Sequence, residues 1–586
     1  MAGESAGRGR ALPVQERQGA GGWVMKGEKA RYRMAALGAG LAMALCADAL
    51  RAQIPDAGRA IRDLQSVLPA MPSGHTAPEV QLPEPQPPAA VSGVAAAGPA
   101  VRVLEFHVEG NHAVDAATLQ AVLADLTGAA LTFPDLRAAA DRITAYYHDQ
   151  GYVLARAYLP PQAIDAGIVR IAVLEGRYGE IGLRNRARVR DAVLEQALSA
   201  LRPGQAVQAG ELERALLLLS DLPGVAVKGT LQPGAETGTT SLLVDAEAGP
   251  LVFGSLDADN FGGYYTGEYR LSGSIGVNNP LRLGDQLNLR LLGSDGGQRY
   301  YNAAYQLPLG SRSTRVGMGV SSMRYELGRR FGPLGAHGRA DVSTVFIQQP
   351  LVRSRHASLR LQLQHERKRL VDSMDLFEVS SRKRIGLWTL ALAGSSEDGW
   401  FGGGRTALQL SHGRGRLRLG DPQAEGEDRQ TVRAAGWFAR TNLSISRLQQ
   451  LTGRLQLYAR VDAQWASKNL DSSEKFSLGG PYGVRAYPLG AVSGDEGWLA
   501  GAELRYQLAP GWQLSAFADR GNVRLSKRRW TPGRNHNGLA AAGLGVTQYG
   551  AGHQVNLSVA WPMGRQPPAT ESDREPRFWL QASRYF

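Results

Sequence analysis

One stretch of this sequence decides its fold: Leu455-Gln456-Leu457-Tyr458-Ala459-Arg460-Val461-Asp462-Ala463-Gln464-Trp465. Apolar residues and a tryptophan occupy the odd-numbered positions, while polar residues and a tyrosine occupy the even-numbered ones. Strict alternation of this kind indicates a β-strand with one apolar and one polar face. Strands of soluble sandwiches are usually ~5–6 residues long, whereas a tilted strand needs about 9–11 residues to cross a bilayer. The stretch therefore predicts a strand between lipid and a water-filled lumen.

The same alternation recurs along the C-terminal part of the chain, in 286–291, 357–364, 498–508 and 554–561. We expect roughly sixteen such strands, with first residues near 251, 267, 285, 299, 314, 340, 357, 385, 404, 431, 454, 498, 512, 539, 553 and 577. An open sheet cannot sit in lipid, because the amides at its edges would lack partners. Residues 249–586 are therefore predicted to form a closed, 16-stranded antiparallel transmembrane β-barrel.

The connections between these strands alternate in length from the fifth strand onward. Long ones are expected near 326–339, 369–384, 414–430, 468–497, 522–537 and 563–576. Tight turns such as 508–511 lie between them. Long loops on one side and short turns on the other are typical of outer-membrane barrels.

The N-terminal region has the parts of a secretory signal peptide. The apolar run Met34–Ala47 is shorter than the ~20 residues of a transmembrane helix, follows several basic residues and ends among alanines. We expect a signal peptide in 1–52, with Met25 as a candidate true start, whose removal would take away the single cysteine, Cys46. The alternative is a buried core helix.

Two small modules are expected between the signal and the barrel. A helix is predicted over 53–67 and an extended, proline-rich linker over 68–100. Residues 101–176 then show the order β-α-α-β-β, with helical patterns at 115–127 and 134–149 and strands near 103–108, 152–159 and 168–174. The same order recurs in 177–248, which predicts two copies of one α+β module.

Several classes of function are excluded by what the sequence contains. The net charge of +13 is spread among glycines and alternating apolar residues, which does not suit a nucleic-acid-binding face. A single cysteine excludes a disulfide framework and a thiolate zinc site. No Gly-x-Ser-x-Gly elbow is present, and His365-Glu366 lacks the second histidine of a zincin. We predict no enzymatic activity, no catalytic residues, no cofactor and no metal.

Several segments resemble a known family. The stretches 105–111, 151–162 and 173–176 are similar to the polypeptide-transport-associated (POTRA) domains of two-partner secretion transporters, of the haemolysin and filamentous-haemagglutinin activator type. The resemblance covers residues 53 to 586. It implies that the helix at 53–67 is a plug that can enter the barrel, and that the terminal aromatic residue, Phe586, is a signal for the barrel-assembly machinery. Chance termination on phenylalanine is the alternative.

Two paired motifs are the most specific part of this resemblance. The stretch 479–488 resembles the tip of the long sixth loop, which folds into the lumen in this superfamily; it contains Val484, Arg485 and Tyr487, and Ala486 replaces the usual glycine. The partner motif on the thirteenth strand contains Phe517, Asp519 and Gly521. An arginine and a carboxylate in a lumen can form a bidentate, charge-assisted pair. Alternatively, Arg485 is a solvated loop residue and Asp519 pairs elsewhere.

The resemblance implies an outer-membrane pore with its N-terminal modules in the periplasm. It would translocate a large adhesin-like or haemolysin-like exoprotein without nucleotide energy. Expected partners are that exoprotein, the barrel-assembly machinery, periplasmic chaperones and outer-membrane lipid, with no nucleic acid. The alternatives are an outer-membrane protein insertase of the same superfamily and a general porin for small solutes.

Overall fold

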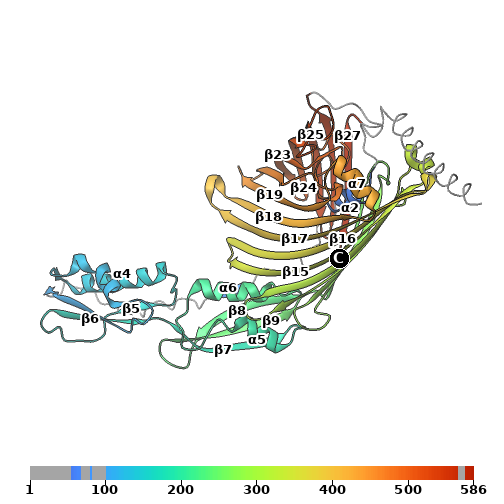
Figure 1. The fold of residues 1–586 in the computed structure, drawn as a ribbon. Helices are drawn as coiled ribbons and strands as arrows, with labels where there is room; N and C mark the ends of the chain where they lie inside the picture. Colours follow the sequence, from blue (N-terminus) through green and yellow to red (C-terminus); the bar gives the residue numbers. More distant parts are fainter. Residues whose placement is uncertain (1–54, 67–78, 82–99, 565–573) are drawn as a thin grey trace, which may run out of the picture.

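The computed structural model describes residues 55–66, 79–81, 100–564 and 574–586. The expected signal peptide and most of the linker lie outside these residues. The described chain forms a large barrel, two small α+β modules at one end of it, and the helix α2 (Ala57–Ser66) inside it (Figure 1).

The barrel closes around sixteen antiparallel strands, as predicted. Closure occurs where the last strand pairs with the first, for example Ser255 with Tyr585. In barrel order the strands are β10 (Val252–Asp259), β11 (Arg270–Asn278), β12 (Gln286–Ser294), β13 (Arg299–Leu309), β14 (Thr314–Glu326), β15 (Ala336–Arg353), β16 (Ala357–Met374), β17 (Val379–Asp398), β18 (Gly404–Leu419), β19 (Gly436–Gln450), β20 (Leu455–Ala466), β23 (Glu496–Ala509), β24 (Trp512–Arg524), β25 (His536–Gly550), β26 (His553–Pro562) and β27 (Arg577–Tyr585).

The alternation of β20 places its two faces as the sequence indicates. Val461 and Trp465 are exposed on the outside, while Gln464 points inward and is buried against the loop that follows the strand. Asp519 lies on β24, the thirteenth barrel strand.

One of the expected long loops is wrong, and a second begins later than expected. β16 and β17 continue past the expected loop at 369–384 and leave only the turn η4 (Asp375–Phe377) and one further residue between them. β18 likewise runs to Leu419 before α7 (Pro422–Gln430). These ends are rich in arginine, which we interpreted as loop composition. Cross-strand pairing keeps them extended, and their arginines point outward and are exposed. Asp372 and Lys383 of the same ends point into the lumen.

Two modules of the expected β-α-α-β-β order precede the barrel (Figure 1). The first contains β2 (Val101–Arg102), β3 (Glu105–Glu109), α3 (Ala116–Val122), η2 (Ala124–Leu126), β4 (Ala130–Leu131), α4 (Phe133–Asp149), β5 (Arg156–Tyr158) and β6 (Ile168–Leu174). The second contains β7 (Arg177–Arg186), α5 (Asp191–Leu198), α6 (Ala209–Ser220), β8 (Val225–Pro233) and β9 (Thr239–Ala248). Each has its own apolar core.

The first helix and the fourth strand of module one are shorter than predicted. Leu123, which follows α3, has a non-helical ψ near zero, so the predicted helix over 115–127 breaks into α3 and the 3-10 turn η2. The strand expected over 152–159 is reduced to β5, because Tyr152 to Ala155 form a hydrogen-bonded turn after the positive-φ Gly151.

The linker contains one element that its composition does not predict. Residues Glu79–Gln81 form the strand β1, which pairs in parallel with Lys228–Thr230 of β8. Proline cannot donate to a ladder, and these three residues, between Pro78 and Pro83, retain their amide donors. The linker therefore adds a fourth strand to the sheet of module two.

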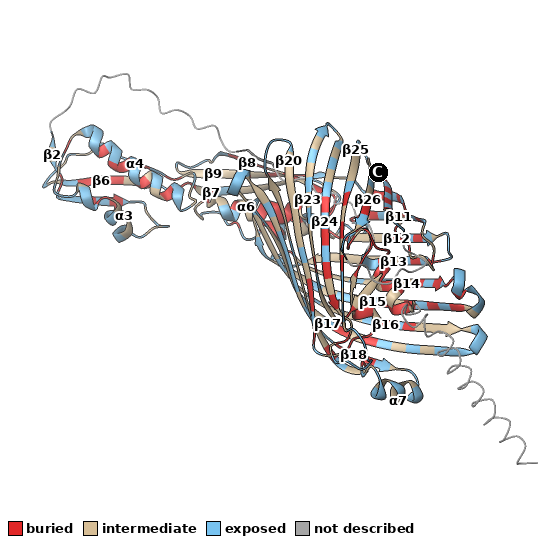
Figure 2. Cartoon of the chain, turned by 90° about the horizontal axis from the view of Figure 1, so that it is seen from above, coloured by how far each residue is buried: buried red, intermediate tan, exposed pale blue. Residues whose placement is uncertain are grey.

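Module two contacts the turns at one end of the barrel. Arg353 binds Asp221 with both guanidinium branches at 2.8 Å, and Arg355 lies 3.3 Å from Glu213 of α6. The amide of Arg190 donates to the carbonyl of Arg282 in the β11–β12 turn. The modules and α7 lie at opposite ends of the barrel (Figure 2).

Candidate functional site: the occupied barrel lumen

The loop between β20 and β23 folds into the barrel. It carries η6 (Ser472–Glu474) and a short hairpin of β21 (Phe476–Leu478) and β22 (Val492–Gly494), which packs against β24. Leu478 is completely buried there. A Cβ atom on Gly521 would come within 2.6 Å of a Leu478 methyl carbon. Gly521 therefore lets the hairpin approach the barrel wall.

The tip of this loop is held by a forked ion pair. Nε of Arg485 donates to Oδ2 of Asp519 at 2.8 Å, and Nη2 donates to Oδ1 at 3.0 Å. The remaining branch, Nη1, binds Glu503 of β23 at 2.7 Å. The structure thus brings together the two residues that the motifs single out, and it adds a second carboxylate that the sequence analysis missed. An outward-inward count along 498–508 places Glu503 on the polar face and could have found it.

The Arg485 side chain is largely shielded from water, at 16% exposed. The Asp519 side chain has no exposed area, and the guanidinium carbon lies 3.3 Å from the centre of the Phe517 ring. Trp579 of β27 donates its indole N–H to the Arg485 carbonyl at 2.6 Å. Burial disfavours the charge on Arg485, but hydrogen bonds and charges of Asp519 and Glu503 raise its pKa above the ordinary value. The loop tip is therefore fixed by ionised groups.

The other motif residues of the loop belong to an apolar cluster beside the ion pair. Val484 and Tyr487 are buried with Phe517 in this cluster. Ala486, which replaces the usual glycine, does not have a positive φ and is itself buried. An alanine is therefore compatible with the backbone at this position.

A second anchor holds the base of the loop, and no motif indicated it. Glu474 is fully buried, with Oε1 2.8 Å from Nζ of Lys368 on β16 and Oε2 2.8 Å from Nε of Arg440 on β19. Burial would raise the pKa of Glu474, but the two cations and the hydrogen bonds lower it. Strand alternation predicts that Lys368 and Arg440 point inward. It does not predict that they bind Glu474, because Glu474 lies on a loop that folds into the barrel.

The helix α2 fills part of the remaining lumen. Its apolar side chains Ala57, Ile61 and Leu64 are buried in the same cluster as lumenal residues such as Tyr325 and Leu370. A Cβ atom on Gly58 would lie 2.5 Å from the Ser472 hydroxyl oxygen. The helix therefore packs tightly against both the barrel wall and the loop.

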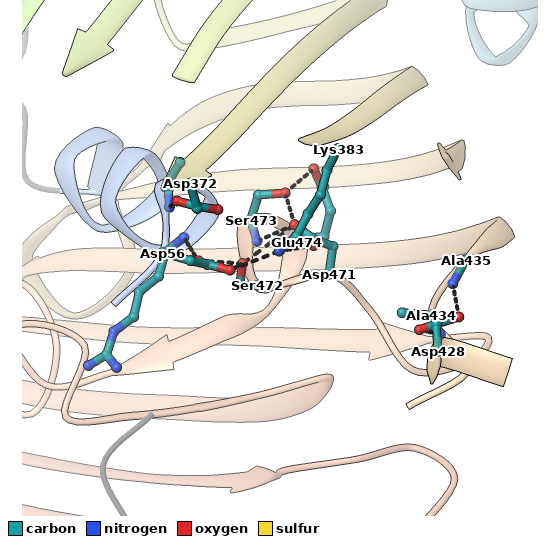
Figure 3. A network of polar contacts seen from close by, with 12 residues as sticks. Asp56, Asp372, Lys383, Asp428, Ala434, Ala435, Asp471, Ser472, Ser473 and Glu474 are labelled. Atoms are coloured by element: carbon teal, nitrogen blue, oxygen red, sulfur yellow. Dashed lines mark hydrogen bonds and ion pairs between the residues drawn. The ribbon is translucent and has the colours of Figure 1, made fainter. Parts of the chain in front are cut away.

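Polar contacts at the start of α2 join the helix, the loop and the wall (Figure 3). Lys383 of β17 lies 2.9 Å from Asp56 and 3.2 Å from Asp471 of the loop. Ser472 donates to Asp56 at 2.7 Å, and the amide of Ala57 donates to Asp372 of β16. Burial would raise the pKa of Asp56, but the Lys383 charge and these hydrogen bonds lower it to about 2. The network is thus a charged contact shared by all three segments.

The last strand closes the barrel with its aromatic end on the outside. Phe578, Leu580 and Phe586 are exposed on the outer face, and the Phe586 backbone exchanges hydrogen bonds with Gly254. Arg584, on the same face, donates to the carbonyl of Ala551 in the neighbouring turn at 3.1 Å. The arginine is therefore bound at the rim.

Within the described residues, no cluster of His, Cys, Asp or Glu side chains is suited to hold a metal ion. The helices of that same part of the chain are all too short or too polar to cross a membrane.

The loop and strand motifs lie in a region that matches a family model. The model for haemolysin secretion/activation proteins of the ShlB/FhaC/HecB type matches residues 238–548. This chain belongs to that family. A second model, for POTRA domains of the ShlB type, matches residues 101–176.

Known secretion/activation relatives cover most of the chain. The heme/hemopexin transporter protein HuxB of Haemophilus influenzae (strain 86-028NP) is 28% identical over 488 residues, covering 81% of this chain and 85% of HuxB. The outer membrane transporter CdiB of Escherichia coli O6:K15:H31 is 26% identical over 430 residues, covering 70% of each chain. The solved structure of CdiB from Escherichia coli has a TM-score of 0.68 at 21% identity, covering 86% of this chain and 93% of that one, which shows the shared fold.

The family assignment confirms the prediction of a two-partner secretion transporter. The protein is an outer-membrane transporter that moves a partner exoprotein to the cell surface, with its POTRA modules in the periplasm. Its barrel end that contacts module two is accordingly the periplasmic end, and α7 lies on the extracellular side.

Proposed function

We propose that the exoprotein passes through the lumen now occupied by α2 and the loop of residues 467–495, and that both segments move aside for it. The observation that carries this proposal is the kind of contact that holds them. The loop has two ionic anchors, at Glu474 and Arg485, and α2 shares the Lys383 network. Such contacts can be exchanged for water one at a time. Each segment adds only a few side chains to the apolar clusters of the barrel wall.

The two POTRA modules are proposed to receive the unfolded exoprotein. Extended peptides bind to open sheet edges through backbone hydrogen bonds. β3 and β5 are the edge strands of the module-one sheet, and β7 is an edge strand of module two. The other edge of module two, β8, is covered by β1. The open edges are the proposed receiving strands.

The remaining partners are proposed from the barrel itself. The outward aromatic residues of β27, including Phe586, support recognition by the barrel-assembly machinery, with periplasmic chaperones delivering the chain. The family model and the relative HuxB describe secretion and transport proteins, which supports transport without an enzymatic step. Folding of the exoprotein outside the cell would supply the free energy for its translocation.

The exoprotein is proposed to be a large surface protein of the adhesin or haemolysin kind. Because the relative HuxB is named as a heme/hemopexin transporter, a haem-acquiring exoprotein is the first cargo to test. Deleting this gene should abolish secretion of the exoprotein in the neighbouring reading frame, and a plasmid copy should restore it. Unchanged secretion together with depleted outer-membrane proteins would instead support the insertase alternative.

A further inference from the structure

One side of the barrel carries a dense group of outward-facing arginines near its extracellular end. This group, the arginine surface, lies on the neighbouring strands β14 to β18, which are labelled in Figure 2. Strand alternation places all its members on the outer face, and every one is exposed. The arginine surface consists of Arg324, Arg339, Arg367, Arg369, Arg382, Arg384, Arg414, Arg416 and Arg418.

The strand register sets several of these arginines directly opposite one another. Arg369 of β16 pairs with Arg384 of β17, which pairs with Arg418 of β18, so three cations form one row across the sheet. Arg324 and Arg339 form a second direct pair. Like charges in directly opposite positions destabilise a sheet. The arrangement therefore calls for a source of negative charge.

The protein supplies little of that charge. Among the described residues, Arg339 with Asp341 at 2.8 Å is the one ion pair made by the arginine surface. Asp341 is also the register partner of Arg369, so the row of three arginines has one carboxylate at its β15 end. Arg414 and Arg416 lie over the ring of Trp437 of β19, at 5.4 and 5.9 Å from its centre. A cation over an aromatic face is stabilised, but its charge is not neutralised. The counter-charge must come from outside the chain.

The level of the arginine surface shows where it lies in the membrane. β16 begins at Ala357 and β18 begins at Gly404, both at the periplasmic end. About ten residues of a tilted strand cross the hydrocarbon, and counting ten residues from these two starts stops just before Arg367 and Arg414. Leucine is the most frequent outward residue below that level on the two strands. The arginines therefore begin where the lipid headgroups of the outer leaflet begin.

The other side of the barrel lacks this imbalance. β27 carries Phe578 and Leu580 on its outer face. On β24 the outward Arg524 is bound to Glu496 of the adjacent strand at 3.3 Å. Arg520 of the same strand is exposed but lies opposite Ala500 and Ala540, so it has no arginine beside it in its row. The rows of directly opposed arginines thus mark a specific surface on one side of the barrel.

We propose that the arginine surface binds the phosphate groups of the anionic glycolipid in the outer leaflet. Guanidinium groups bind phosphate oxygens in pairs, with a geometry that lysine does not provide. The row of Arg369, Arg384 and Arg418 provides three guanidinium groups at the height of the lipid headgroups. Trp437 lies beside them at the interface, where tryptophan is favoured. A bound phosphorylated headgroup relieves the repulsion within the row and fixes the orientation of this side of the barrel.

The test uses the full-length protein in detergent micelles, titrated with phosphorylated lipid A and with chemically dephosphorylated lipid A, and followed by native mass spectrometry. Arg369→Gln, Arg384→Gln and Arg418→Gln are combined in one variant. Arg520→Gln, an outward arginine of β24 on the other side, is the matched control. The parent and control should bind phosphorylated lipid A equally well, and the triple variant at least about tenfold more weakly.

Two outcomes would overturn the proposal. One is equal binding of phosphorylated lipid A by the triple variant and the parent; the other is equal binding of the phosphorylated and dephosphorylated lipids by the parent. Heat-modifiable migration of each variant verifies that its barrel is folded, and Arg416→Gln alone, measured in the same way, should give a smaller loss in the same direction. Inorganic phosphate at millimolar concentration should not displace the bound lipid A, because the proposed ligand is a phosphate group carried by a lipid.

Discussion

Lys368 of β16 and Glu474 of the lumenal loop form an ion pair of 2.8 Å in which the lysine side chain is 6% exposed and the glutamate side chain is completely buried. Arg440 approaches the second carboxylate oxygen from β19, also at 2.8 Å. One carboxylate on the loop therefore holds together two strands that are not neighbours in the barrel. This anchor lies before the loop tip, so the loop is fixed at its base as well as at Arg485.

Glu474→Gln should destabilise this anchor strongly. The substitution leaves Arg440 without its carboxylate and Lys368 with only the more distant Glu366, at 3.9 Å. Breaking a buried pair costs about 3–5 kcal/mol. We expect faster proteolysis within residues 467–495 and a lower unfolding midpoint of the barrel. Glu425→Gln on α7 is the control, because its pair with Arg429 is exposed and is worth about 0.5 kcal/mol or less. Equal behaviour of the two variants would refute the role of Glu474 as an anchor.

The contact between Asp56 and Lys383 should keep α2 in the lumen. Deletion of residues 55–66, or Lys383→Met, removes this contact and should raise the single-channel conductance in planar bilayers without preventing insertion. Arg405→Met serves as the control, because Arg405 makes an exposed contact with Glu397 at the periplasmic end. If the deletion leaves the conductance unchanged, α2 does not limit the pore.

The same contact predicts how the closed pore responds to acid. The pKa of Asp56 is lowered from 3.8 to about 2 when α2 is docked. The docking contribution of its charge is therefore complete above pH 3.8 and is lost as the pH falls through about 2. The wild-type conductance should stay low between about pH 7 and about pH 5, where Asp56 remains ionised. If the wild-type conductance rises between about pH 7 and about pH 5 and that of Asp56→Asn does not, Asp56 is not the ionised docking group.

The sequence predicted the barrel well because alternation is a local property of each strand. Fourteen of the sixteen expected strand starts lie within four residues of the observed ones, those of β17 and β19 are six and five residues away, and Asp519 falls on the expected strand. The ends of β16, β17 and β18 were missed, since arginine-rich strands beyond the membrane resemble loops in composition. The partner Glu474 was missed for a different reason: its contacts depend on how a long loop folds back, which no local pattern encodes. Glu503 lies on β23, and strand alternation could have placed it on the inward face.

The POTRA modules should bind the exoprotein as an isolated pair. A fragment of residues 101–248 contains both apolar cores and lacks β1, so the edge of β8 is open. It should retain the N-terminal segment of the exoprotein in a pull-down. A fragment of residues 68–248, which includes β1, should retain less, because that edge is paired. Absence of binding by either fragment at high micromolar concentration would argue against a receptor role.

The pair of Arg485 and Asp519 should be required for secretion but not for assembly of the barrel. Arg485→Ala leaves Asp519 without its cation in a site that excludes water, and Asp519→Ala removes the fork that orients the loop tip. Each variant should form a heat-modifiable barrel in the outer membrane and secrete the exoprotein at least about tenfold less than the wild type. Arg520→Ala, on the outer face beside Asp519, is the control and should secrete normally.

A charge exchange tests the pair itself. Arg485→Asp combined with Asp519→Arg restores opposite charges, but the new carboxylate at position 485 would face Glu503, which binds Arg485 at 2.7 Å. Glu503→Gln must therefore accompany the exchange, and the triple variant should recover part of the secretion that Arg485→Asp alone loses. The double variant Arg485→Asp with Glu503→Gln removes the neighbouring carboxylate but does not supply an arginine at position 519. If the triple variant recovers secretion and this double variant does not, the recovery comes from the opposite charge of the partner. Wild-type secretion by Arg485→Ala would exclude the pair as the anchor of the loop.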